Sequence, residues 1–310
     1  MNETNSKIYT VIVTHLPDET TLIPLLQRFL TQVSHIVIVD NTPKNDDRLS
    51  EQIIGARLSL DRVFIARLGD NLGIATALNI GIEIARGEGA YFVVLSDQDS
   101  LPSKDMVPNL LAAYHALTAD GIAVGVVGPT FTDVHTRLVY PFQAQIPGKF
   151  FYGHACAESE TPQVEAITLI TSGSLIPLPV LDDVGTMRED FFIDHVDVEW
   201  CHRARARGYH LYGTGWAHMA QRMGDDSLRI WYGCWQNESA YSPLRIYYRL
   251  RNFVALLRID HIGWRWKARN ALYWLKTVYA HSLFGNQKIK SLQMALKGIW
   301  HGLRGRMGRL

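Results

Sequence analysis

Short apolar runs alternate with helix-like apolar patterns over the first third of the chain. Each run ends at polar residues and is bounded by turn residues, which is typical of strands buried on both faces. The predicted strands cover residues 8–13, 36–39, 62–66 and 91–96. Helical spacing predicts one helix that begins near Asp18 and a second that begins at Asn71. This order of elements predicts right-handed crossovers and a mostly parallel sheet flanked by helices, and therefore an α/β fold.

The middle of the chain continues this pattern less regularly. Residues 107–117 are predicted to form an amphipathic helix and residues 122–127 another strand, whereas residues 131–163 show no clear period. A strand over residues 166–170 is predicted to run into Thr171-Ser172-Gly173-Ser174. A turn of this composition lets the backbone come close to a ligand.

Residues 261–310 differ from the rest in pattern and in charge. Two segments, 265–283 and 292–303, have apolar residues at helical spacing, so a helical C-terminal extension is predicted. The region holds 10 of the 31 Lys and Arg residues and none of the 30 Asp and Glu residues, although the whole chain has a net charge of +1. Basic amphipathic helices that carry Trp are typical of anionic membrane surfaces, and packing against the rest of the chain is the alternative. A nucleic acid partner is not expected, because the remaining chain is acidic and has no recognition motif.

Composition narrows the class of protein. A chain of 310 residues with 47% apolar residues predicts a globular protein of one large or two ordinary domains. The three cysteines lie far apart, so neither a disulfide framework nor a zinc site is indicated and a reducing compartment fits best. The start of the chain does not look like a secretory signal, and no apolar run reaches 18 residues. We therefore expect a cytoplasmic protein without a membrane span.

Two carboxylates, Asp97 and Asp99, follow the fourth predicted strand. Acids in such places are commonly turn residues or helix caps, but here other polar residues also follow strands. Because ligands bind at the carboxyl ends of strands in such sheets, we expect Thr14, Asp40 and Asn71 to lie there as well. Two aspartates at this spacing can hold a divalent cation, Mg²⁺ or Mn²⁺, against a diphosphate. The loop after the first strand has no glycine, which disfavours a glycine-rich phosphate cradle.

A second group of acids lies at the start of a helix that is predicted to reach Arg207. At about 100° per residue Asp194 and Asp197 lie about 60° apart, whereas Glu199 lies roughly 160° from Asp197. A carboxylate at this helix start, beside two Phe residues, is expected to have a raised pKa and to act as a general base. Favourable charge on the helix dipole is the alternative. Among the histidines, His218 is the candidate metal ligand.

These segments resemble the inverting glycosyltransferases of family 2, which have the GT-A fold, and within that family the bacterial rhamnosyltransferases. The Asp-Gln-Asp-Ser segment together with Val-Asp-x-Glu-Trp-Cys is similar to the rhamnosyltransferase branch. The matching segments are Val11-Ile12-Val13-Thr14, Val39-Asp40-Asn41, Asn71-Leu72-Gly73, Ala77-Leu78-Asn79, Leu95-Ser96-Asp97-Gln98-Asp99-Ser100, Phe192-Ile193-Asp194-His195-Val196-Asp197-Val198-Glu199-Trp200-Cys201 and Tyr247-Tyr248-Arg249-Leu250-Arg251-Asn252.

The resemblance implies a role for individual residues. Asp40 and Asn71 would help bind the nucleotide, and Asp97 the ribose or a metal-bound water. Asp99 would bind the divalent cation and Asp197 would be the base.

The sequence departs from the family pattern at two places. Val196 stands where the broad family has Glu before the base. The family also has a histidine shortly before a Gly-Asp pair, here Gly224-Asp225, and Gln221 occupies the aligned position, with His218 three residues earlier.

The resemblance further implies a donor, an acceptor and a location. The donor would be dTDP-L-rhamnose, and the acceptor a lipid-linked polysaccharide precursor at the inner face of the cell membrane. The alternatives are a transferase of the same fold that uses another nucleotide sugar, and a non-catalytic nucleotide-sugar-binding scaffold on the membrane. The expected domains are a GT-A catalytic domain over residues 1–255, with a nucleotide-sugar half (1–130) and an acceptor half (131–255), and a basic helical region over residues 256–310.

Overall fold

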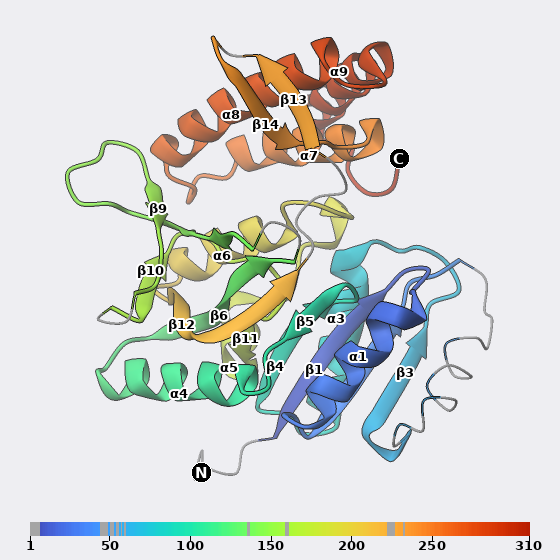
Figure 1. The fold of residues 1–310 in the computed structure, drawn as a ribbon, viewed down its shortest axis with the longest axis vertical. Coiled ribbons are helices and arrows are strands. Elements are labelled where there is room, and N and C mark those ends of the chain that lie inside the picture. The colour runs from blue at the N-terminus through green and yellow to red at the C-terminus, as the bar shows by residue number, and fades with distance from the viewer. Residues whose placement is uncertain are drawn as a thin grey trace.

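The apolar runs near the start of the chain form the parallel part of a large sheet (Figure 1). The computed structural model describes residues 7–43, 49, 53, 56, 58, 60–134, 137–158, 161–221, 227–231 and 233–310. Strand β1 pairs in parallel with β2 and β4, and β2 pairs with β3. These strands are β1 (Ile8–Thr14), β2 (His35–Asp40), β3 (Val63–Arg67) and β4 (Phe92–Asp97). The register sets Val13 beside both Val39 and Asp97, so three strands end at one edge of the sheet.

Mixed pairing extends the sheet beyond β4. In the described part of the chain the strand order is β10-β12-β6-β11-β4-β1-β2-β3, with β5 paired to β12 and β7 to β6. The bounds are β5 (Ser100–Pro102), β6 (Val124–Asp133), β7 (Val139–Tyr140), β10 (Gln163–Ala166), β11 (Leu175–Pro177) and β12 (His210–Gln221). Two small sheets pair β8 (Phe142–Ala144) with β9 (Gly153–Ala155), and β13 (Ser227–Trp231) with β14 (Trp235–Ser239).

The middle of the chain is more regular than its sequence indicates. Strands β7 to β10 lie in or near the segment 131–163, which was predicted to be irregular, and β10 ends where the strand over 166–170 was predicted to begin. These strands are two to four residues long, which is too short for a period to show in the sequence. The sequence also did not predict β12, whose apolar alternation is interrupted by Gly213, Gly215 and an irregularity between Thr214 and His218.

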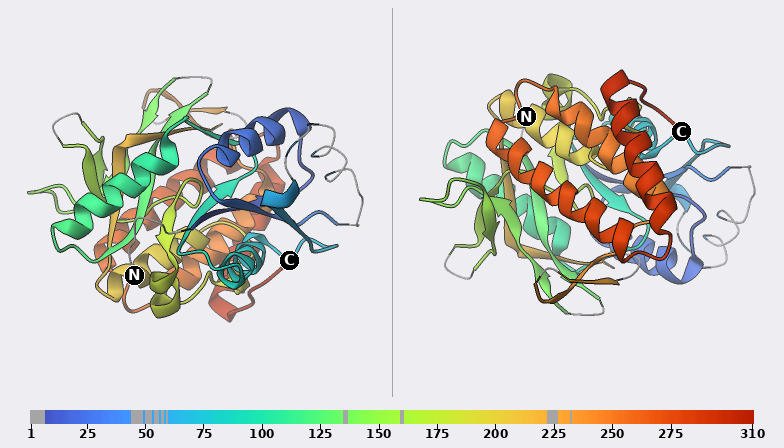
Figure 2. Two further views of the ribbon diagram at one scale, coloured as in Figure 1. Left: turned by 90° about the horizontal axis from the view of Figure 1, so that it is seen from below. Right: turned by 90° about the horizontal axis from the view of Figure 1, so that it is seen from above.

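Helices cover both faces of the sheet (Figure 2, left). Buried residues of α1 and α4 pack on one face, and those of α3, α5 and α6 pack on the other. Close packing of α3 needs a glycine, because a Cβ at Gly81 would lie 2.3 Å from a methyl carbon of Val11. The bounds are α1 (Glu19–Leu30), α3 (Ile74–Gly87), α4 (Met106–Ala119), α5 (Leu178–Val184) and α6 (Val196–Ala206), with 3₁₀ turns η2 (Leu60–Arg62) and η3 (Glu189–Phe191). The predicted α/β fold is confirmed.

Three C-terminal helices lie together above the sheet (Figure 2, right). They are α7 (Pro243–Leu257), α8 (Trp264–Leu283) and α9 (Lys288–Arg304). Helix α9 meets α7 through backbone, since a Cβ at Gly298 or Gly302 would lie 2.5 or 2.7 Å from the carbonyl oxygens of Tyr247 and Arg251. The predicted helical extension is therefore packed on the rest of the chain. Among the described residues no helix has the length and apolar character to span a bilayer. The division into domains at residue 255 stays a prediction; it falls in the last turn of α7.

Candidate active site

The ends of β1 and β2 carry a buried cluster of polar side chains. Thr14 Oγ1 donates to Asp40 Oδ1 over 3.2 Å, and the Thr42 hydroxyl donates to the same oxygen over 2.6 Å. The neighbouring Asn41 extends the cluster, because its Nδ2 donates to Asn71 Oδ1 over 3.2 Å. The structure thus brings Thr14, Asp40 and Asn71 together at one edge of the sheet, as the strand order predicted.

The turn after β4 is attached to this edge from two sides. The backbone N–H of Asp97 donates to Ser172 Oγ over 3.1 Å, and Ser172 belongs to the predicted turn over 171–174. The amide of Gln98 accepts from the backbone N–H of His15 (2.8 Å) and donates to the carbonyl of the same residue (3.1 Å). Asp97 is partly buried and Asp99 is exposed. The two carboxylates are therefore held beside the cluster around Asp40.

Negative charge accumulates around Asp97. Burial and the charges of Asp99 and Asp197 raise the pKa of Asp97 to about 7, while the Gln221 amide and Arg245 oppose this rise. Gln221 Nε2 lies 3.5 Å from Asp97 Oδ2, and its Oε1 is buried with no partner among the described residues. Close carboxylates together with an unpaired amide oxygen are the donor set that a hard divalent cation prefers. Among the described residues no three His, Cys, Asp or Glu side chains form a metal cluster, so a Mg²⁺ or Mn²⁺ ion here would need the Gln221 oxygen as well as the carboxylates.

Asp194 and Asp197 differ in environment although they are three residues apart. The Asp194 side chain is 5% exposed and forms ion pairs with Arg245 (2.6 Å) and Arg249 (2.9 Å). Burial works to raise the pKa of Asp194, but the two guanidinium groups outweigh it and hold that pKa below the usual range. Burial raises the pKa of Asp197, and the Asp194 charge adds to this, although backbone N–H groups of Val198 and Thr171 and the charge of Arg249 oppose it. Asp197 is therefore the better proton acceptor of the two.

A left-handed turn places Asp197 in the first turn of α6. Phe192, Asp194 and His195 have φ values of 64°, 63° and 61°, which L-residues adopt rarely and at a cost. The Asn252 amide offsets this cost, because its Nδ2 donates to the carbonyls of Phe191 (3.0 Å), Ile193 (2.8 Å) and Asp194 (2.8 Å). The segment Tyr247–Asn252 is thus a clamp on the loop before the helix.

The same turn supports the loop around Asn71. The backbone N–H of Ile74 donates to the Phe192 carbonyl over 2.7 Å. Gly73 has a φ of 91°, and a Cβ there would lie 2.7 Å from that carbonyl oxygen. Nearby, Arg309 Nη1 lies 2.9 Å from Asp70 Oδ1, so the end of the C-terminal region also contacts this loop.

His218 and Gln221 lie on different faces of β12. Side chains alternate along a strand, so Gln221 shares the face of Met219, whose sulfur contacts Ser172 Oγ beside Asp97. His218 is exposed, and its side chain points to the opposite face of the strand. The Gly224-Asp225 pair lies outside the described residues. The parity of the strand thus sets Gln221, and not His218, beside the carboxylates.

Comparisons with known proteins agree on one family. Residues 10–171 match the model of the family described as glycosyl transferase family 2. The chain is 31% identical over 306 residues to dTDP-rhamnosyl transferase RfbF of Shigella flexneri, which covers 98% of each chain. An uncharacterized protein of Mycobacterium tuberculosis (strain ATCC 25618 / H37Rv) is 29% identical over 196 residues. The match covers 61% of this chain and 68% of the mycobacterial chain.

Solved structures share the fold at low identity. A structure of GalNAc-T7 with UDP, GalNAc and Mn²⁺ superposes with a TM-score of 0.61 and 11% identity, covering 98% of this chain and 57% of that one. The structure of TarS from S. aureus gives a TM-score of 0.53 and 15% identity, covering 96% of this chain and 49% of that one. The predicted GT-A arrangement of the sheet and helices is therefore confirmed.

The clamp on the left-handed turn can be tested without any substrate. Asn252→Ala leaves buried carbonyls unsatisfied, which costs about 1–3 kcal/mol for each buried group, so thermal unfolding should occur at a lower temperature. The amides of residues 192–197 should exchange with deuterium at least about tenfold faster than in the parent chain, because the turn opens more often.

Asn270→Ala is the matched control. Asn270 is also buried, on α8, where it donates to the Trp266 carbonyl (2.9 Å) and to the Tyr152 hydroxyl (3.2 Å). This variant should lose stability but leave exchange at 192–197 near the parent value. Unchanged exchange in Asn252→Ala would show that the turn holds its shape without the clamp.

Proposed function

Because the chain belongs to glycosyl transferase family 2, we propose that it transfers L-rhamnose from dTDP-L-rhamnose to a hydroxyl group of a lipid-linked polysaccharide precursor. The similarity to a dTDP-rhamnosyl transferase over 98% of both chains supports this donor. The observation that carries the chemistry is that Asp97 and Asp197 meet at one turn, because the Asp97 N–H donates to Ser172 Oγ and the Thr171 N–H donates to Asp197. A proton acceptor thus lies beside the carboxylates proposed to hold the diphosphate of the donor.

Asp197 acts as the general base in the proposed step. The acceptor hydroxyl oxygen attacks the anomeric carbon from the face opposite the diphosphate, and its proton passes to the Asp197 carboxylate. The bond from the anomeric carbon to the diphosphate oxygen breaks, the nucleoside diphosphate leaves and the configuration inverts. The raised pKa of Asp197 makes it a stronger base than an ordinary aspartate, which favours this proton transfer.

The proposed cation site combines Asp99, Asp97 and the Gln221 Oε1 atom. A divalent cation, Mg²⁺ or Mn²⁺, bound there would neutralise charge on the leaving diphosphate. Support comes from the buried Gln221 oxygen without a described partner and from the elevated pKa of Asp97. The role predicted for His218 stays a prediction, and its place on the other face of β12 favours Gln221.

The donor nucleotide is proposed to lie on the cluster formed by Thr14, Asp40 and Asn71. Thr14 bonds to Asp40 and Asn41 bonds to Asn71, and the Asn41 N–H donates to the Thr14 carbonyl, so the positions of these residues are set before a ligand binds. Asp97 ends the strand next to that of Thr14, and the ribose and diphosphate are expected to run from the cluster toward Asp97.

The C-terminal helices are proposed to rest on the anionic inner face of the cell membrane. Helix α9 packs on α7, but α8 and α9 still expose apolar side chains to solvent. Each of the following is at least 52% exposed: Leu272, Leu275, Leu283, Ile289, Leu296, Trp300 and Leu303. Exposed basic residues, Lys288, Lys290, Lys297 and Arg304, accompany them. An exposed apolar surface with flanking cations is typical of peripheral attachment to anionic lipid.

A donor panel tests the proposed reaction. Release of nucleoside diphosphate, with a membrane extract as the acceptor source, should be fastest with dTDP-L-rhamnose.

Asp197→Asn should lower kcat by about 10²–10⁴-fold with donor affinity little changed, because the base acts on the proton of the acceptor. In the parent chain kcat should fall as the pH drops through the raised pKa of Asp197, since only the carboxylate accepts a proton. A faster reaction with another nucleotide sugar would change the donor, and donor binding without any turnover would favour the scaffold alternative.

The cation site is tested by calorimetry with and without EDTA. Asp99→Ala should remove the dependence of donor binding on the cation, and Gln221→Ala should weaken Mn²⁺ binding by about tenfold, because one oxygen ligand is lost. His218→Ala is the matched control on the same strand and should bind Mn²⁺ like the parent. Equal losses in the Gln221 and His218 variants would contradict this assignment of the ligands.

Membrane attachment is tested with lipid vesicles. Leu275→Glu should weaken binding to anionic vesicles by about tenfold or more, because it removes apolar area that the membrane would bury and adds a negative charge that anionic lipid repels. Leu138→Glu is the control, since Leu138 is 65% exposed but lies outside the C-terminal helices. Binding should also weaken as salt rises. Equal binding to neutral vesicles, or equal loss in both variants, would remove the membrane from the proposal.

A further inference from the structure

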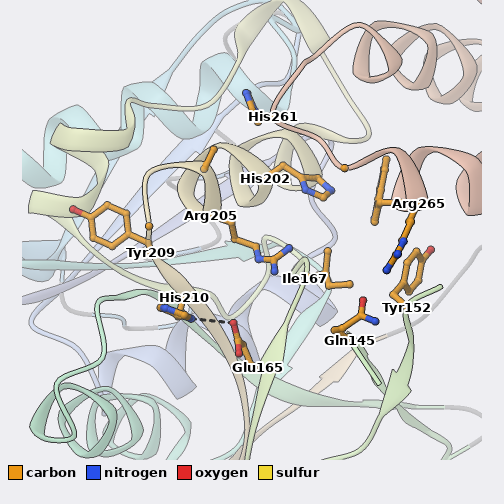
Figure 3. A pocket seen from close by; sticks show the side chains of 14 residues that line it. Gln145, Tyr152, Glu165, Ile167, His202, Arg205, Tyr209, His210, His261 and Arg265 are labelled. Atoms are coloured by element: carbon orange, nitrogen blue, oxygen red, sulfur yellow. Dashed lines mark hydrogen bonds and ion pairs between the residues drawn. The ribbon is translucent and has the colours of Figure 1, made fainter. Parts of the chain in front are cut away.

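A pocket of about 540 Å³ lies away from the carboxylates of the candidate active site. Figure 3 shows it between the last turns of α6, strand β10 and the start of α8. Arg205 reaches into it from α6 and Arg265 from α8, and His202 lies between them at the inner wall. Neither Asp97, Asp99 nor Asp197 lines this pocket, so the reaction proposed above leaves it without a role.

Basic side chains outnumber acidic ones in the lining. Arg205, Arg265 and His261 lie at its rim, and Glu165 is the one acidic side chain among the lining residues. Glu165 is already engaged, since its Oε1 lies 2.9 Å from His210 Nδ1. Within the described residues neither Arg205 nor Arg265 forms an ion pair. The pocket therefore offers two guanidinium groups to an anion from outside.

The N-terminal end of α8 adds to this field. The helix has 20 residues, and its N-cap, Gly263, supplies no side-chain hydrogen bond to the free backbone N–H groups of the first turn. Gly263, Arg265 and Trp266 all line the pocket. Free N–H groups at the positive end of a helix dipole bind oxyanions, and phosphate above all.

Two buried nitrogen atoms in the lining have no partner within the described structure. They are His202 Nε2 and Trp266 Nε1, on side chains that are 5% and 6% exposed. The two rings meet edge to face with their centroids 4.7 Å apart. Burial lowers the pKa of His202 to about 3, and the charges of Arg205, His261 and Lys267 add to this, so the ring is neutral at ordinary pH. Both nitrogen atoms lie behind the pocket surface, and the Trp266 ring is therefore a reporter on the pocket wall.

From this arrangement we propose that the pocket binds a phosphate group carried by the acceptor, an inference that rests on the proposed function. Two arginines can each donate two parallel hydrogen bonds to phosphate oxygens, and the backbone N–H groups at the helix end supply further donors. Helix α6 links the two sites, since Asp197 lies in its first turn and Arg205 in its last. Eight residues at 1.5 Å each separate them by about 12 Å along the helix axis. A phosphate held here fixes one end of the acceptor while its hydroxyl reaches Asp197.

Inorganic phosphate is the probe for the site. It is titrated into the full chain in EDTA at constant ionic strength, and the indole N–H signal of Trp266, assigned from Trp266→Phe, is followed by NMR. We expect a saturable shift with phosphate and a much weaker one with acetate, which represents the carboxylate alternative. Arg205→Gln should weaken phosphate binding about tenfold or more, and Arg205→Lys, which keeps the charge, by less.

Arg207→Gln is the matched control. Arg207 lies two residues further along, outside the pocket, and pairs with Asp183 over 3.0 Å. This variant should bind phosphate within about twofold of the parent. The absence of a saturable shift at Trp266, or equal losses in the Arg205 and Arg207 variants, would overturn the proposal.

Turnover separates this inference from the proposed function. With a phosphorylated soluble acceptor, Arg205→Gln should raise KM about tenfold and leave kcat unchanged, whereas KM for the same acceptor without phosphate should not move. Phosphate binding is measured without donor or turnover, so its failure would leave the proposed function standing. Intact phosphate binding in a chain that transfers no sugar would refute the proposed function instead.

Discussion

The geometry of the candidate site depends on one strained turn and on the helix that holds it. Phe192, Asp194 and His195 adopt left-handed backbone conformations, and the Asn252 amide binds three carbonyls of this segment. The turn sets the start of α6, and with it Asp197. Its Phe192 carbonyl also accepts from the start of α3, so the loop around Asn71 rests on the same support. The parts proposed to hold the nucleotide and to accept the proton therefore share one anchor, and that anchor is α7.

The two aspartates at the start of α6, Asp194 and Asp197, show how the surroundings give like residues different roles. Both are largely shielded from water, which by itself favours the protonated acid. Arg245 and Arg249 reverse this for Asp194, which becomes a permanent anion with a structural role. Asp197 lacks such a pair of cations and keeps an elevated pKa. The positions of the two residues in the chain do not distinguish their roles. The charged side chains around each residue do.

The sequence predicted most of the elements that run for more than five residues, because a long apolar run shows its period. It also predicted which polar residues follow strands, and these lie together in the structure. The pattern of residues did not separate Asp194 from Asp197, and only the family resemblance favoured Asp197, because the arginines that distinguish them lie about fifty residues further along the chain. It favoured His218 over Gln221 by residue type, whereas the face of β12 that each occupies depends on a register that local spacing does not reveal. The strand itself was hidden by its glycines.

The glycine contact between α9 and α7 has a mechanical consequence. At Gly298 and Gly302 the two backbones touch without side chains between them, so the helices have little freedom to slide or tilt against each other. Through Asn252, helix α7 also holds the left-handed turn that fixes the position of Asp197. Whatever surface α8 and α9 rest on, the height of Asp197 above that surface is thus set by rigid parts. If Asp197 is the base, it can deprotonate only a hydroxyl group that stands at that height.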